Sequence, residues 1–396
     1  MSSIRVGIGF STEKNAQRAA EEAFLQAKTT LGLSHINLAI VFSSTDLAYT
    51  SLLQEISLLA EGAAIIGCSS AGIISSQGIS RYGVAILLLG FPDGVFVNTG
   101  YVKDISKKDM LEAGTQLAEK LLYGFAGVRR DLSIIFSDGI MKDGSQLIHG
   151  LQQRLGLSFP LIGASASDDL QFLKTYLYYN QNAWSDSACG LLLGGKINFG
   201  IGIRHGWQPL GKMRTITRSQ GNTVFEIDGQ IATHLYKEYF GFTLSQLRKE
   251  LKRISVLYPI GLLLPGEKEY LLRNILAVKD DGSIVFQGDV PEGSCMRLMI
   301  GTRDSCIEAA RQALRDAQSR MLGHPIDFLL VFDSVSRYIL LGKDAPRELL
   351  ALQEEAGQTP IIGFYTYGEQ APLTFINYRG KSYFHNQSIC VIAIGG

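Results

Sequence analysis

Continuous apolar runs of strand length recur along most of the chain. Residues 84–89 and 389–394 are uninterrupted apolar stretches, which is typical of strands that are buried on both faces. Three further runs, at 38–44, 132–138 and 328–334, each end in small polar residues. That ending is expected where a buried strand delivers its carboxyl end to a surface loop. Helical spacing of apolar residues follows most of these runs, so the pattern predicts alternating strands and helices.

Parts of this pattern are internally similar. Residues 4–10 and the helical stretch that follows have a counterpart that begins at 296–302, with Ala19–Ala20 placed on Ala309–Ala310. The aligned strands carry a phenylalanine near their ends, and the next strand in each copy carries a glycine: Phe42, Phe136, Phe332, Gly67, Gly163 and Gly363. Repeats of about a hundred residues are too long for a solenoid and indicate duplicated small modules.

The repeats and the stretch between them give a domain plan. The first domain is expected at 1–200, with two related modules at 3–100 and 101–200. The second is expected at 201–396, with a β-rich insert at 201–294 and a third related module at 295–396. The insert carries a hairpin signal at Asp281-Gly282 and a capped short helix that starts at Thr243.

The predicted fold class is therefore α/β, at the border with α+β. It consists of duplicated small α/β modules with mixed sheets that are covered by helices. No proline-rich or serine-rich linker separates the two halves, so they are expected to pack on each other. A cleft between such halves is a usual place for a small ligand.

Charge and composition narrow the possible partners. Lys plus Arg and Asp plus Glu number 37 each among 396 residues, and no basic stripe is present. A nucleic-acid partner is therefore not expected, because such proteins neutralise a phosphate backbone with clustered cations. The apolar runs are too short to span a bilayer, and the first residues lack the features of a signal peptide. We expect a cytoplasmic protein without membrane insertion.

The side chains that hold metals or nucleotides do not form recognisable motifs. The five cysteines include no CxxC pair, and the six histidines are scattered along the chain. Structural zinc and a catalytic metal are therefore not expected. The string GIGF at 7–10 does not complete a dinucleotide fingerprint, and a phosphate-binding GxxxxGK[ST] loop is missing. The sequence predicts no cofactor.

Several stretches resemble a known family. The glycine-serine turn at 66–72 is similar to the N-terminal FIST domain (F-box and intracellular signal transduction). Residues 224–241, 258–299 and 361–391 are similar to the C-terminal FIST domain, with Tyr367-Gly368-Glu369 as a specific part. This resemblance implies an intracellular sensory domain that binds a small polar ligand, such as an amino acid or a similar metabolite. It also implies a signalling partner such as a kinase or a cyclase.

The strand ends supply the first candidate ligand-binding residues: Ser43, Ser44, Ser69, Ser70, Asp138 and Ser165. Hydroxyl groups and exposed backbone N–H groups in such turns can hold a carboxylate. The competing interpretation is that small residues close tight turns and cap helices.

A second group of candidates comes from the C-terminal half. Arg273 is the one charged residue in an apolar strand-like run, so it is expected to meet either a ligand carboxylate or an internal acidic partner. Glu369 follows Tyr365 and Tyr367 and is expected to hold an amino group beside two rings. His385 and Asn386 either fix the turn before Glu369 or line the pocket.

Two other functions stay open at this point. One is a hydrolase that uses Cys68 or Ser69, although the glycine spacing of the hydrolase nucleophile elbow is incomplete around both serines of the turn. The other is a signalling scaffold without a ligand. The leading prediction is a ligand-binding module and not an enzyme.

Overall fold

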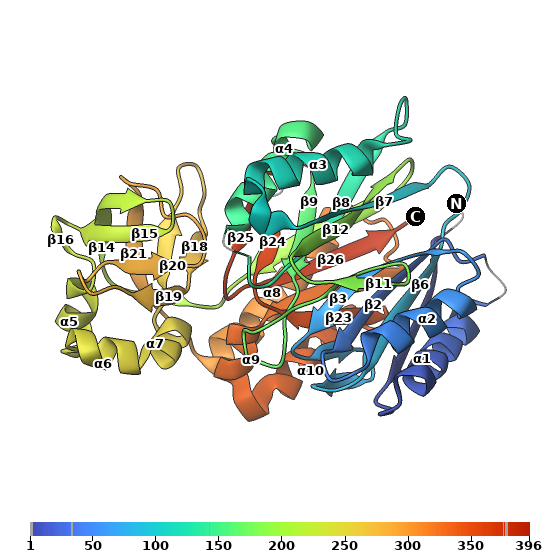
Figure 1. The fold of residues 1–396 in the computed structure, drawn as a ribbon, viewed down its shortest axis with the longest axis horizontal. Helices are drawn as coiled ribbons and strands as arrows, with labels where there is room; N and C mark the ends of the chain where they lie inside the picture. The colour runs from blue at the N-terminus through green and yellow to red at the C-terminus, as the bar shows by residue number, and fades with distance from the viewer. Residues whose placement is uncertain (1–2, 33–34, 142, 375, 377–378) are drawn as a thin grey trace.

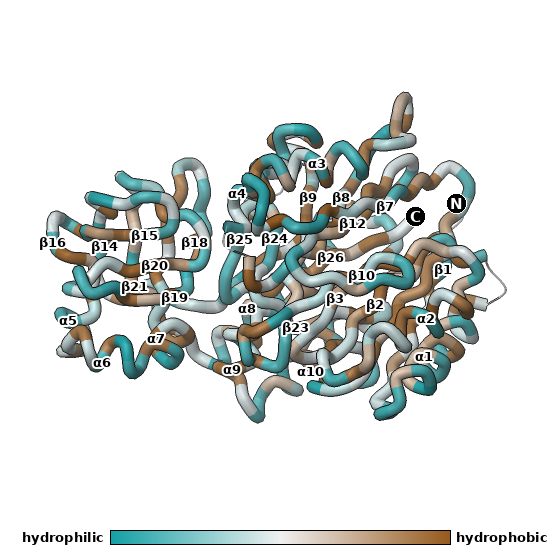
Figure 2. Tube along the Cα trace, viewed as in Figure 1, coloured by the Kyte–Doolittle hydropathy of each residue, from teal (hydrophilic) through white to brown (hydrophobic). Residues whose placement is uncertain are grey.

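The computed structural model describes residues 3–32, 35–141, 143–374, 376 and 379–396. They form a large body of three sheets with helices on the outside, from which a smaller β-rich domain projects to one side (Figure 1). Brown, apolar strands fill the body, whereas α1, α3 and α4 carry teal, polar residues on the surface (Figure 2). Within the described residues, no helix is long and apolar enough to cross a membrane.

The first sheet has the strand order β1-β6-β2-β3-β10-β11. Its strands are β1 (Arg5–Ser11), β6 (Val84–Gly90), β2 (Leu38–Ser44), β3 (Ala64–Ser70), β10 (Leu177–Tyr179) and β11 (Asn182–Trp184). Only β2 and β3 are parallel, and they are joined by α2 (Tyr49–Leu59), as a parallel pair requires. Helix α1 (Ala16–Leu31) begins at Asn15, whose side chain accepts a hydrogen bond from the Arg18 N–H.

The second and third sheets repeat this order. The second runs β25-β24-β9-β8-β12-β7, and the third runs β13-β26-β22-β23-β4-β5. The strands of the second sheet are β25 (Ser382–His385), β24 (Glu369–Pro372), β9 (Leu161–Ser165), β8 (Arg130–Ser137), β12 (Ser187–Gly194) and β7 (Phe96–Lys103). Those of the third are β13 (Asn198–Arg204), β26 (Ile389–Gly395), β22 (Phe328–Ser334), β23 (Ile361–Thr366), β4 (Ile73–Ser75) and β5 (Gly78–Ser80).

Helices cover the outer faces of these two sheets as well. The second module carries η1 (Ile105–Lys107), α3 (Met110–Leu122) and α4 (Gly144–Leu155); the third carries α8 (Arg303–Arg320), α9 (Val335–Leu341), η2 (Gly342–Asp344) and α10 (Ala345–Ala356). The carboxylates of Asp109 and Asp143 cap α3 and α4 by accepting hydrogen bonds from backbone N–H groups. The predicted α/β class with duplicated modules is confirmed.

Each module contributes a hairpin to a neighbouring sheet. The β4–β5 hairpin of the first module joins the third sheet, where β4 pairs with β23. The β10–β11 hairpin of the second module joins the first sheet, where β10 pairs with β3. The β24–β25 hairpin of the third module joins the second sheet, where β24 pairs with β9. The three modules are therefore built into one another, and none has a complete sheet of its own.

The inner faces of the three sheets share one apolar core. The aligned residues Phe42, Phe136 and Phe332 meet there, with ring centroids 5.6 Å apart for the first pair and 5.8 Å for the second. Phe364 packs against all three rings. The alignment of phenylalanines in the sequence therefore marks the centre of the molecule.

The third module begins with a different strand from the expected one. In the third module, β13 takes the place that β1 has in the first. Gly202 of β13 lies against Ala313 of α8 in the same way as Gly9 of β1 lies against Ala23 of α1. A Cβ at Gly202 would stand 1.8 Å from the Ala313 carbonyl oxygen, so only glycine allows this contact. The expected start at residue 295 lies instead in the insert, whereas the alignment of Ala19–Ala20 with Ala309–Ala310 agrees with this geometry.

The insert between β13 and α8 forms the projecting domain. Its sheet has the order β18-β17-β21-β14-β15-β20-β19, with β16 paired to β15. The strands are β14 (Gln208–Gln220), β15 (Thr223–Ile227), β16 (Gln230–Ile231), β17 (Ile260–Leu263), β18 (Tyr270–Arg273), β19 (Ile275–Val278), β20 (Ile284–Phe286) and β21 (Cys295–Ile300). Its helices are α5 (His234–Phe240), α6 (Leu244–Lys249) and α7 (Leu251–Leu257).

Candidate functional site

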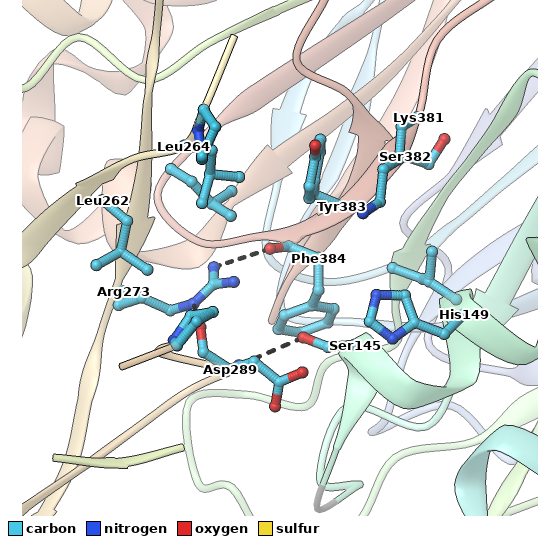
Figure 3. A pocket seen from close by; sticks show the side chains of 14 residues that line it. Ser145, His149, Leu262, Leu264, Arg273, Asp289, Lys381, Ser382, Tyr383 and Phe384 are labelled. Atoms are coloured by element: carbon cyan, nitrogen blue, oxygen red, sulfur yellow. Dashed lines mark hydrogen bonds between the residues drawn. The ribbon is translucent and has the colours of Figure 1, made fainter. Parts of the chain in front are cut away.

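A cavity of about 380 Å³ lies where the insert domain meets the second sheet (Figure 3). Its walls come from β17 and β18 of the insert, from α4 of the second module, and from β25, the hairpin strand of the third module. Leu262, Leu264 and Leu271 give the insert side an apolar surface. Small-ligand sites commonly have about 300–1,000 Å³ and an apolar lining with a few polar groups.

Arg273, the last residue of β18, brings a buried guanidinium to this cavity. Its side chain is only 3% exposed. The Nε–H donates to the Asp289 carbonyl at 2.9 Å, and Nη1 donates to the carbonyls of Leu272 and Phe384 at 3.0 and 2.9 Å. These three bonds hold the group between the insert and β25, and Figure 3 shows the one to Phe384.

The charge of Arg273 has no direct counter-charge. In the part of the chain that the structure describes, it forms no ion pair, and its Nη2 makes no hydrogen bond. Burial lowers the pKa of Arg273 to about 10, opposed by the more distant Asp289 and Asp143. The guanidinium therefore stays charged at neutral pH in a place where an unpaired charge is costly.

Other polar groups border the same cavity. Asp289 also lines the cavity, and its N–H donates to the Ser145 hydroxyl at 3.4 Å. His149 of α4 and Lys381 stand on the opposite side (Figure 3). A cation, a carboxylate and an apolar wall thus surround one small volume.

The predicted serines of the first module lie elsewhere, buried at the junctions between modules. Ser43 and Tyr178 share a hydrogen bond between their hydroxyls at 2.7 Å, and the Ser44 hydroxyl accepts the Gly83 N–H at 3.1 Å. The Ser69 hydroxyl donates to the Ser167 carbonyl at 2.9 Å. Ser70 donates to the Gly72 carbonyl and accepts the Gly72 N–H. These partners make turn closure and module assembly the visible role of the four hydroxyls.

The two predicted residues of the second module also have internal partners. The Asp138 carboxylate accepts hydrogen bonds from the N–H groups of Ile140 and Asp186 and from the Thr175 hydroxyl. Burial raises the pKa of Asp138, and these bonds oppose that shift. Asp138 also borders a second cavity of about 370 Å³. Ser165 shares a hydrogen bond of 3.2 Å with the Ser137 hydroxyl.

The predicted trio at 365–369 does not converge on the cavity. The Tyr367 hydroxyl donates to the Asp168 carboxylate, and its ring stacks on Phe172 at 4.2 Å. The Tyr365 ring packs on Tyr338 at 4.6 Å. The Glu369 carboxylate is fully buried and accepts the Ser388 N–H at 3.0 Å. All three side chains face protein groups.

His385 ends β25, and Asn386, the next residue, ties this strand to the insert. The Asn386 side-chain oxygen accepts the Asn274 N–H at 3.1 Å, directly after Arg273. His385 Nε2 bonds to the Ala371 carbonyl at 2.9 Å, and burial lowers the pKa of His385 to about 3. The imidazole is therefore neutral at physiological pH, and both residues support the wall that holds Arg273.

Of the predicted site residues, the cavity contains Arg273, while His385 and Asn386 stand behind it. Sequence reasoning missed Ser145, His149, Asp289 and Lys381. The sequence contains a weak signal for Asp289, because this residue lies at the end of the predicted strand that follows the hairpin turn at Asp281-Gly282. The other three lie in ordinary helix or strand contexts, without a motif.

Two family models match most of the chain. The model of the FIST N domain matches residues 37–230, and the model of the FIST C domain matches residues 232–372. An uncharacterized protein of Mycobacterium tuberculosis is 24% identical over 382 residues, which cover 93% of this chain and 95% of that protein. An uncharacterized protein of Methanocaldococcus jannaschii is 23% identical over 271 residues, which cover 64% of this chain and 52% of that protein.

Among solved structures, a cyanuric acid hydrolase from A. caulinodans aligns over 98% of this chain and 99% of its own. The TM-score is 0.37 and the sequence identity is 8%. A likeness at this level supports no conclusion about chemistry.

Proposed function

The chain belongs to the FIST family, and from that premise we propose that it is an intracellular sensory protein whose small polar ligand binds at Arg273. The ligand is an amino acid or a similar metabolite that carries a carboxylate. Binding is passed on to a signalling partner, such as a kinase or a cyclase. The chain acts as a binding module and not as an enzyme.

The observation that carries this proposal is the uncompensated guanidinium of Arg273. Its hydrogen bonds go to three uncharged carbonyls, and its Nη2 is left for a further acceptor. A buried cation of this kind is stabilised when an anion binds beside it, because a charge-assisted hydrogen bond forms in a low-dielectric place. A ligand carboxylate supplies that anion.

The remaining lining fits the other parts of an amino acid. The Asp289 carboxylate lies on the same side as Arg273 and can accept an ammonium group. Leu262, Leu264 and Leu271 offer an apolar wall to the side chain. We therefore place apolar amino acids first among the candidates.

The position of the cavity connects binding to signalling. Arg273 donates to a carbonyl of the insert, Asp289, and to a carbonyl of the body, Phe384. A ligand between these two parts favours the arrangement in which both contact it. It shifts the equilibrium only by the difference in its affinity for the two arrangements.

The hydrolase alternative lacks an activated nucleophile. Burial raises the pKa of Cys68 well above its ordinary value, and the neighbouring Cys189 adds to that shift. The thiolate is the reactive form of cysteine, so this thiol stays unreactive at neutral pH. Ser69 is fully buried, with its hydroxyl bonded to backbone groups of Ser167 and Tyr176.

Thermal denaturation with matched probes tests the proposal. Leucine, 4-methylpentanoate without the amino group, and 3-methylbutylamine without the carboxylate are compared, followed by the other standard amino acids. We expect carboxylate-bearing probes to raise the melting temperature and the amine alone to have no effect. A ligand at a hundred times its Kd stabilises the folded state by about 2.7 kcal/mol.

Two variants locate the effect. Arg273→Met is expected to reduce the shift strongly, whereas Arg248→Met, in the insert but outside the cavity, is expected to keep it. If Arg273→Met folds and responds as the parent does, binding at this cavity is wrong. If no carboxylate shifts any form and a signalling protein copurifies, the scaffold alternative is favoured.

A further inference from the structure

A second buried charge cluster stands apart from the Arg273 cavity. Arg337 of α9, Asp333 at the end of β22, Glu348 of α10 and Glu369 at the start of β24 come from four different elements. Arg337, Asp333 and Glu369 are fully buried, and Glu348 is 2% exposed. In the first two modules, the position of Asp333 is held by Ser43 and Ser137, so the charges are particular to the third module.

Arg337 is the centre of the cluster and also touches the neck of the insert domain, meaning the chain segments 205–207 and 301–306. Its Nε donates to Asp333 at 2.7 Å, and its Nη2 donates to Glu348. Nη1 donates to the His205 carbonyl at 2.6 Å, and Nη2 to the Cys306 carbonyl at 2.9 Å. The chain leaves the body at the first carbonyl and returns at the second, so one guanidinium holds both passages.

The charges of the cluster do not balance. Asp333 and Glu348 pair with one guanidinium, and Glu369 acts electrostatically on the same cluster. Among the described residues, Asp333 Oδ2 and Glu369 Oε1 have no hydrogen-bond partner. Burial raises the pKa of Asp333 well above its ordinary value, and Glu348 and Glu369 add to that shift against Arg337. Burial likewise raises the pKa of Glu369. Neighbouring carboxyl groups in such a place share protons, because they cannot all ionise.

The two histidines near the cluster are neutral and add no positive charge to it. Burial, together with Arg337 and Arg204, lowers the pKa of His205 to about 3, and His385 is similarly neutral. The other titratable or charged groups that face the cluster are Tyr338, Tyr365, Cys306, Cys390 and, beyond Cys390, Arg320. Burial raises the pKa of Tyr365, Cys306 and Cys390, so these three are also neutral.

We propose that the cluster around Arg337 holds a proton in the folded protein and that opening the neck of the insert domain releases it. A neutral carboxyl on Glu369 or Asp333 leaves Arg337 free to satisfy its remaining partners and both neck carbonyls at once. Loss of the proton adds a buried negative charge that competes for the same guanidinium. The neck is thus a place where protonation controls the attachment of the insert to the body, with or without a ligand in the cavity.

The sign of the pH dependence follows from the raised pKa. A carboxyl that titrates near about 4.3 when exposed stays protonated when the cluster is closed. The proton's contribution to the stability of the closed cluster is complete below the pKa of the exposed carboxyl. It is lost progressively as pH rises toward the pKa of the carboxyl in the folded protein. In this range, the equilibrium constant for opening rises about tenfold per pH unit for each proton released.

Hydrogen exchange of the full chain between pH 5.5 and 8 tests this directly. After correction for intrinsic exchange, we expect protection of peptides that cover the neck to fall as pH rises, by up to about tenfold per pH unit for each proton released. In Glu369→Gln, which keeps the shape without the charge, this dependence is expected to flatten. Glu354→Gln, on α10 but 64% exposed and outside the cluster, is expected to behave as the parent protein.

Asp333→Asn and urea unfolding keep the proposal falsifiable if the first variant folds poorly. The urea concentration at the unfolding midpoint of the parent protein is expected to fall as pH rises. In whichever of the two variants folds, Glu369→Gln or Asp333→Asn, this fall is expected to be smaller. Neck protection without pH dependence in the parent overturns the proposal. Equal slopes in the parent and in both cluster variants also overturn it.

Discussion

Two arginines are buried to nearly the same extent, and they differ in what neutralises them. Arg337 is 0% exposed and pairs with two carboxylates and two carbonyls. Arg273 is 3% exposed and bonds only to carbonyls. Burial alone lowers the pKa of either group, but Glu348 and Asp333 reverse this for Arg337 and raise its pKa, whereas the pKa of Arg273 falls to about 10.

This difference separates a structural cation from a candidate binding cation. Burial by itself does not distinguish them, since both side chains are removed from water. The distinguishing features are the internal counter-charges of Arg337 and the cavity beside Arg273. Where the protein supplies the anions, the cation already has its partners inside the fold; where it does not, a ligand can supply one.

The largest effect is expected for Arg337→Met. Asp333 and Glu348 lose their cation, and the carbonyls of His205 and Cys306 lose their donor. Breaking a buried pair by removing one partner commonly costs about 3–5 kcal/mol. Urea denaturation at pH 7 measures this loss in the free energy of unfolding.

A charge-neutral set sharpens this prediction. When Asp333→Asn and Glu348→Gln are added to Arg337→Met, the two carboxylates that pair with Arg337 are removed together with it, so we expect at least half of the lost stability to return. If the single variant is as stable as the parent protein, Arg337 is not the structural cation described here.

The sequence predicted the repeated parts of the fold well. Apolar runs marked the central strands, and the aligned Phe42, Phe136 and Phe332 are in contact at the core. Local signals also held in the insert: Asp281-Gly282 closes the β19–β20 hairpin, and Thr243 caps α6 with a capping box. These features depend on short-range patterns, which a single sequence contains.

The exchange of hairpins between modules was not predictable in this way. Strand β24 pairs with β9, about two hundred residues away, and nothing in its four residues specifies that partner. The insert also hid β13, because it separates this strand from its helix. The cavity depends on both features, so Arg273 was identified as a candidate, but its neighbours Asp289 and His149 were not.

Arg273→Met is expected to affect binding more than folding. A hydrogen bond to a charged group contributes about 1.5–3 kcal/mol, so the affinity for a carboxylate ligand is expected to fall about 10–100-fold. Stability is expected to change by about 1–2 kcal/mol, because the lost hydrogen bonds are offset by removal of an uncompensated charge. Calorimetric titration and urea denaturation on the same preparation measure the two quantities. A stability loss equal to that of Arg337→Met would remove the distinction between the two arginines.

The pH dependence of binding reports the charge of Arg273 itself. With a pKa of about 10, the guanidinium is protonated at pH 7 and begins to lose its charge only near pH 10. The affinity for 4-methylpentanoate is therefore expected to keep its Arg273 contribution up to pH 9 and to fall by up to tenfold per unit above pH 10. Arg273→Lys is expected to move this fall to lower pH, because burial lowers the pKa of an ammonium. The same profile in both proteins would mean that another group carries the carboxylate.

The smallest effect, and the most selective one, is expected for Asp289→Asn. Asp289 lies near Arg273 and opposes the lowering of its pKa, yet its carboxylate is not paired with that guanidinium. If it accepts the ammonium of an amino acid, the variant weakens leucine binding about 3–10-fold, within the range of a charge-assisted contact near a protein surface. Binding of 4-methylpentanoate is expected to hold or to tighten, since a repelling negative charge is removed. Equal weakening of both probes would show that Asp289 shapes the wall of the cavity and does not contact the amino group, whereas Arg273 would keep its role.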